Sequence, residues 1–136
     1  MRLQLHLYDE SGMTPEGIAI YSLADPRAVR ASRYVGQTAH PAERLMQHVR
    51  TARLSSPAET PWWVKTPQLR PLYGWIRQLY IQEGRLPVMM VHSWVQPQQA
   101  HQAERHHIHA ALEQGLPILN LALHQICAAA RRAGSS

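Results

Sequence analysis

Two side chains able to contact phosphate, Arg44 and His48, lie one helical turn apart in a segment whose pattern predicts a helix. That spacing places both on one helix face, which is ordinarily a solvated face. Glu104 is less ordinary, because it lies one turn before Ile108 on the edge of a helix face expected to be buried. A carboxylate there costs free energy unless it is paired, protonated or bound to a cation. A salt bridge to a nearby arginine and a metal-binding role both remain open on this pattern alone.

Three more polar side chains are found among apolar neighbours. Asn120 stands inside the sequence LPILNLAL, and a buried amide needs specific hydrogen-bond partners. Tyr21 and Tyr34 fall in two predicted strands, and both phenols can point to one face of the sheet if these strands pair. Tyrosine is common in strands, so an ordinary structural role is the simpler explanation for each phenol by itself.

Together these side chains supply what phosphodiester hydrolysis requires. An anionic ligand holds a cation that neutralises the phosphate and the leaving oxygen, and an arginine stabilises the added negative charge. A further group must take a proton from the attacking water. The net charge of +5, carried by a chain with Lys65 as its only lysine, is compatible with a nucleic-acid partner. It is equally compatible with a genome that favours arginine codons.

The elements that position these residues follow from the hydropathy pattern. Alternating or β-branched segments predict strands over 2–8, 17–23, 33–38 and 88–95. Amphipathic segments predict helices over 41–54, 69–84, 98–114 and 117–132, with a loop over 55–67. The short link between the second and third strands favours antiparallel pairing. The order predicts an α+β domain with a small central three-stranded sheet, mixed or antiparallel, flanked by helices, and an extra N-terminal strand of unknown purpose.

The length of 136 residues and the apolar fraction of 45% predict a single domain. Its core is expected over about 17–125, preceded by an extra strand and loop (1–16) and followed by a short tail (133–136). The sequence has no apolar run long enough to span a bilayer and no signal-peptide pattern, so we expect a soluble cytoplasmic protein without membrane contact. The single cysteine, Cys127, cannot form an internal disulfide and is expected to pack.

The two tyrosine strands carry the motifs AIY (19–21) and YVG (34–36), and on these the sequence resembles the GIY-YIG nuclease superfamily. That family places an Arg and then a His or Tyr in the helix after the second motif, a Glu on a later helix, and an Asn near the next helix. Arg44, His48, Glu104 and Asn120 occupy those places in the same order. The stretch 71–87 is similar to the central helix of compact bacterial members, and the resemblance spans roughly 17–125.

The sequence departs from the family pattern at three points. Ala19 replaces the leading glycine of the first motif, and the link between Tyr21 and Tyr34 is longer than in the shortest members. Gln37 stands where some members have a lysine after the second motif, which removes one cation that could orient phosphate or water.

The resemblance implies a DNA endonuclease that uses one divalent cation, Mg²⁺ or Mn²⁺, and leaves 5′-phosphate and 3′-hydroxyl ends. Glu104 would bind the cation, and Tyr21 would orient or deprotonate the attacking water with His48 as its base partner. Arg44 would contact the phosphate, and Tyr34 would help to position the nucleophile or substrate. Gly36 and Asn120 would support the site. The candidates for contacts to DNA, duplex or branched, are Gln37, Arg33, Arg50, Arg53, Arg70 and Arg77. Specificity would come from the domain itself, a homodimer or a separate partner.

Three other interpretations compete with this one. The first is a catalytically inactive nucleic-acid-binding module on the same fold. The second is a zinc site in the histidine-rich helix, although no two of its members have the i,i+4 spacing usual for zinc ligands: His101, His106, His107 and His109. The third is a protein-interaction domain with the pair Trp62 and Trp63 as an exposed anchor. That pair could instead cap the core or lean on nucleic acid.

Overall fold

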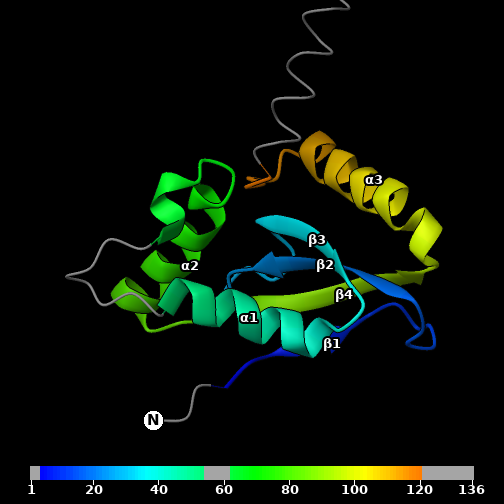
Figure 1. The fold of residues 1–136 in the computed structure, drawn as a ribbon, viewed down its shortest axis with the longest axis horizontal. Coiled ribbons are helices and arrows are strands. Elements are labelled where there is room, and N and C mark those ends of the chain that lie inside the picture. The colour runs from blue at the N-terminus through cyan, green and yellow to red at the C-terminus, as the bar shows by residue number, and fades with distance from the viewer. Residues whose placement is uncertain (1–3, 54–61, 121–136) are drawn as a thin grey trace, which may run out of the picture.

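The structure is a computed structural model that describes residues 4–53 and 62–120. It contains the strands β1 (Leu7–Asp9), β2 (Ile18–Ala24), β3 (Tyr34–Thr38) and β4 (Val88–Val95). The helices are α1 (Pro41–Arg53), α2 (Arg70–Glu83) and α3 (Ala100–Glu113), with short 3₁₀ turns η1 (Trp62–Lys65) and η2 (Pro97–Gln99). The strands form one mixed sheet in the order β1-β4-β2-β3 (Figure 1). The predicted α+β class is therefore confirmed.

Alternation along β2 divides the core into two layers. Ala19, Tyr21 and Leu23 point to the face covered by α1 and α2, where they join the larger buried cluster. Ile20 points the other way, into a smaller cluster with Ile108 of α3. The sheet thus lies between α1 and α2 on one face and α3 on the other (Figure 1). A period of two along one strand is what places these neighbours on opposite faces.

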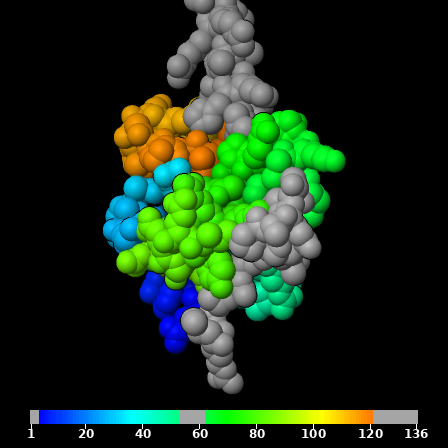
Figure 2. Space-filling model, turned by 90° about the vertical axis from the view of Figure 1, so that its left-hand side faces the viewer, coloured from blue at the N-terminus to red at the C-terminus, as the bar shows by residue number. Residues whose placement is uncertain are grey.

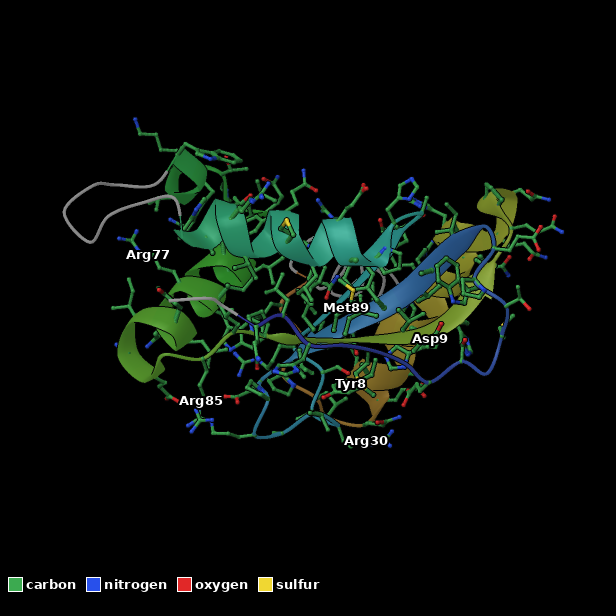
Figure 3. All side chains as sticks on the ribbon, turned by 90° about the horizontal axis from the view of Figure 1, so that it is seen from below. Tyr8, Asp9, Arg30, Arg77, Arg85 and Met89 are labelled. Atoms are coloured by element: carbon green, nitrogen blue, oxygen red, sulfur yellow. The ribbon has the colours of Figure 1, made fainter. Side chains whose placement is uncertain are left out.

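The sheet has four strands, so the prediction of three is wrong. The N-terminal segment adds β1 to the outer edge of β4 in parallel, with Leu7 opposite Met89 and Asp9 opposite Val91. Figure 3 shows Tyr8 and Asp9 along this edge together with Met89. The strand begins later than predicted, at Leu7. Its alternating half-polar sequence suits an edge strand with one covered face, which explains why the segment joins the sheet.

Local signals locate the helix ends well. Pro41 is the first residue of α1, as predicted, because proline lacks a backbone N–H and the first residue of a helix does not need one. Gly84 ends α2 in the left-handed conformation (φ 62°), where its N–H and that of Arg85 bond to the carbonyls of Tyr80 and Leu79. The bond from Gly84 to Tyr80 is that of the αL helix cap, in which glycine avoids a steric penalty.

Two predicted segments differ from the structure. Part of the predicted loop over 55–67 is the 3₁₀ turn η1, in which Trp63 is buried and donates its indole N–H to the carbonyl of Thr51 at 3.3 Å. Trp62 is 64% exposed, so only one of the two tryptophans remains available as an anchor. The helix expected to restart at Pro117 is absent from the described part of that range, because 116–120 has no regular secondary structure. The rest of that helix, with Cys127, lies outside the described residues.

A bulge in β4 occurs beside the catalytic candidates. Ile20 pairs with Ser93 but Tyr21 pairs with Val91, so His92 is the extra residue. Its Nε2 lies 2.8 Å from Ser22 Oγ and its Nδ1 2.7 Å from Glu10 Oε1. These bonds tie the segment after β1 to the centre of the sheet.

Across the described chain, none of the helices has the length and apolar character needed to cross a bilayer.

Candidate active site at the free edge of β3

The free edge of β3 lies between the α1–α2 layer and α3, and the candidate catalytic residues gather there (Figure 1). Antiparallel pairing places Gly36 opposite Tyr21 and Tyr34 opposite Leu23. Both phenols therefore lie on the face covered by α1 and α2, with ring centroids 6.3 Å apart. The prediction that the two tyrosines share a face is confirmed.

His48 is the centre of a buried chain of hydrogen bonds. Its Nε2 lies 2.8 Å from the phenol oxygen of Tyr21, and its Nδ1 lies 3.2 Å from the phenol oxygen of Tyr73. A neutral imidazole carries one N–H, so one phenol donates to the ring and the other accepts from it. His48 has no exposed surface, so the interpretation of this position as part of a solvated face is wrong.

Burial and charge set the protonation of this chain. Burial, assisted by the nearby Arg44 guanidinium, lowers the pKa of His48 to about 3, so the imidazole is neutral at neutral pH. Burial likewise raises the pKa of the Tyr21 and Tyr34 phenols above the usual value. The positive charge of Arg44 partly offsets the rise in pKa of both phenols, because its guanidinium lies near both rings. The site therefore holds neutral phenols, a neutral imidazole and the positively charged guanidinium of Arg44.

Gly36 permits the closest approach in the site. A Cβ atom at this position would lie 2.5 Å from the Tyr21 phenol oxygen and 2.6 Å from Cζ of the same ring. Tyr21 is fully buried and is held by His48, so its ring has little room to move. Gly36 therefore allows the Tyr21 phenol to lie directly against the backbone of β3.

Replacing Gly36 by alanine is expected to lower the free energy of unfolding by about 1–3 kcal/mol, because the new methyl group overpacks the buried Tyr21 ring. Gly74 offers a matched control in α2, since a Cβ there would meet no atom within 4 Å. Gly74→Ala is expected to stabilise the protein by about 1 kcal/mol through helix propensity. Urea denaturation measures both, and equal stabilities of the two variants would contradict the assigned role of Gly36.

Glu104 of α3 faces the same edge from the other side of the sheet. Its Oε2 accepts a hydrogen bond from Gln37 Nε2 at 2.7 Å, and its carboxylate raises the pKa of the Tyr34 phenol. No ion pair within the described residues involves Glu104, so the arginine salt bridge considered from the sequence is not found there. Gln37, expected as a DNA contact, lies against the carboxylate instead.

Asn120 supports β3 rather than joining a helix. Its Oδ1 accepts from the N–H of Val35 at 3.1 Å, and its Nδ2 donates to the carbonyl of Val35 at 2.8 Å. Leu119 donates its N–H to the carbonyl of Arg33 at 2.6 Å. The segment after α3 thus satisfies backbone groups on the otherwise open edge of β3. The supporting role predicted for Asn120 fits this contact, but the residue is not helical.

The candidate arginines for DNA contacts lie on several elements. The Arg33 guanidinium lies over the ring of Trp75, a residue of α2, at 5.4 Å. Figure 2 shows the segment that follows α3 (orange) against the green region that contains α2. Arg77 also lies on α2 (Figure 3). Arg50 and Arg70 are exposed, while the side chain of Arg53 lies outside the described part of the structure.

Tyr73 is a site residue that the sequence did not reveal. It lies one turn from Leu69 and Ile76 on the buried stripe of α2, so its type and spacing resemble ordinary core packing. The tertiary contact with His48 makes its hydroxyl part of the site. A buried phenol in an otherwise aliphatic stripe was the available signal, because such a hydroxyl needs a partner.

No protein-family model matches the chain, and no significant match is found among curated proteins or solved structures. The site is therefore interpreted from its own geometry. Within the residues that the structure describes, no group of three or more His, Cys, Asp or Glu side chains is placed to hold a metal ion.

Proposed function

We propose that this protein is a metal-dependent DNA endonuclease of the GIY-YIG type. The observation that carries the proposal is the buried bond between Tyr21 and a neutral His48, next to the Arg44 guanidinium and across the β3 edge from Glu104. Tyr21 comes from β2, the proton acceptor His48 and the phosphate-binding Arg44 come from α1, and the carboxylate of Glu104 comes from α3. This combination matches the needs of phosphodiester hydrolysis.

The phenol and the imidazole together suit proton transfer. Since burial disfavours the Tyr21 phenolate, Tyr21 would act as a neutral relay. The attacking water would lose its proton to the Tyr21 oxygen while the phenol proton passes to His48 Nε2, 2.8 Å away. This step requires the negative charge of a bound phosphate beside Arg44 to raise the pKa of His48 from its low value in the free protein. Tyr73, on the other ring nitrogen, fixes the orientation of the imidazole. Because Tyr21 is fully buried, this relay requires its partly exposed neighbours Tyr34 and Arg44 to shift before water can reach the phenol oxygen.

Arg44 would neutralise the charge of the phosphate directly, and Glu104 would do so through a bound cation. The half-buried guanidinium suits bidentate binding of phosphate oxygens. The Glu104 carboxylate is partly exposed and retains lone pairs beyond its bond to Gln37, so it fits a divalent cation whose other ligands are waters and phosphate oxygens. A bound cation would supply positive charge for the phosphate and the leaving oxygen.

Cleavage of defined DNA tests the proposal directly. The protein is incubated with single-stranded, duplex, flap and branched DNA in Mg²⁺ or Mn²⁺, and again with EDTA. We expect cutting of at least one form only with the cation, leaving 5′-phosphate and 3′-hydroxyl ends that a ligase can rejoin. The Glu104→Gln protein, purified identically, controls for a contaminating nuclease. Salt-sensitive binding of these DNAs with no cutting in either cation would instead indicate an inactive nucleic-acid-binding module.

A further inference from the structure

Glu104 shares its hydrogen-bond partner with a histidine. Gln37 Nε2 lies 2.7 Å from Glu104 Oε2 and 3.4 Å from His101 Nδ1. His101 and Glu104 are three residues apart on α3, so both project from one helix face toward β3. A single amide nitrogen is therefore within reach of a carboxylate oxygen and an imidazole nitrogen.

This position is chemically suited to a cation. An amide NH₂ group offers positive hydrogens to two lone-pair donors, and a divalent ion lying between these groups would be held by the same two lone pairs. Rotation of the Gln37 amide by half a turn brings its carbonyl oxygen to the place of its nitrogen, because the two ends have the same shape. The set then comprises a carboxylate, an imidazole and an amide oxygen.

We propose that His101 and Gln37 bind the divalent cation together with Glu104, and that this site prefers Mn²⁺ to Mg²⁺. The imidazole is the reason for the preference. Mg²⁺ favours oxygen ligands and retains its waters, whereas imidazole nitrogen suits first-row transition ions. His101 is exposed, so its ring is free to turn toward the ion. The inference rests on the proposed function only in assigning a cation to Glu104.

Cation binding in the absence of DNA tests the inference without relying on catalysis. Loss of the free Mn²⁺ signal in electron paramagnetic resonance gives the dissociation constant, and competition by Mg²⁺ gives the preference. We expect the wild type to bind Mn²⁺ at least about tenfold more tightly than Mg²⁺. His101→Ala should weaken Mn²⁺ binding about tenfold and leave Mg²⁺ binding within about twofold, since Mg²⁺ would replace the imidazole by water. Gln37→Leu should weaken the binding of both ions.

His109→Ala is the matched control, because His109 is an exposed histidine on α3 about 140° around the helix from Glu104. It should bind Mn²⁺ like the wild type. Equal Mn²⁺ affinities of the His101→Ala and His109→Ala proteins would overturn the inference, as would equal affinities of the wild type and Glu104→Gln. Mn²⁺ binding that depends on His101 in a protein that cuts no DNA would uphold the cation site and reject only the nuclease proposal.

Discussion

The Glu104→Gln protein is expected to cut DNA at least about 10³-fold more slowly than the wild type while folding normally. Loss of a carboxylate that holds the cation removes charge stabilisation of the phosphate and the leaving group, which is worth several kcal/mol in the transition state. Glutamine keeps the shape of the side chain and an oxygen that can accept from Gln37 Nε2, now 2.7 Å from Oε2. The substitution therefore changes the charge with little change in packing.

Single-turnover cleavage of the preferred DNA form measures the effect, with urea unfolding of both proteins as a check on stability. Glu113→Gln is the matched control, because this glutamate is exposed at the end of the same helix. It should cut at the wild-type rate. If Glu104→Gln and Glu113→Gln cut equally fast, Glu104 does not hold the catalytic cation.

The sequence predicted the fold wherever one segment carries its own signal. β4 was predicted with its observed bounds, and α2 with its glycine end, because continuous apolar runs and helix-capping residues act locally. The pairing of β1 with β4 was not predicted, because the partner of an edge strand is a segment far away in the sequence and the strand itself carries no signal for it. The same reason applies to the segment 117–120, which an apolar pattern predicted as helix but which has no regular secondary structure and bonds to Val35 through Asn120.

The candidate site shows the same division. His48 and Glu104 were singled out by type and spacing, and Tyr21 mainly by the family resemblance. The structure brings all three to one edge of the sheet. Their surroundings were not predictable in this way. The burial of His48 depends on α2 closing over α1, and the contact of Gln37 with Glu104 depends on α3 packing near β3. Sequence spacing shows which side chains share a helix face, but only the packing of several elements decides which of them exclude water.

The buried His48 is expected to make the protein markedly less stable in acid. Its pKa is lowered from 6.5 to about 3 in the folded state, whereas the unfolded chain titrates near the ordinary value. Above pH 6.5 both states are neutral at this ring and it adds no pH dependence. As the pH falls from there toward 3, the unfolded chain binds a proton that the folded protein does not. The free energy of unfolding should therefore decrease by about 1.4 kcal/mol per pH unit from this group.

Urea midpoints measured between pH 7 and pH 4 test this expectation in wild type, His48→Gln and His109→Gln. The His48 variant is expected to be less stable at pH 7, because two phenols lose a partner, but its stability should depend less steeply on pH. His109→Gln should retain the wild-type slope, since His109 is exposed. His107, whose pKa burial also lowers, contributes equally in all three proteins and cancels in the comparison. Imidazole chemical shifts provide the direct measurement, and a His48 ring that titrates near 6.5 in the free protein would contradict the buried, desolvated environment of this ring.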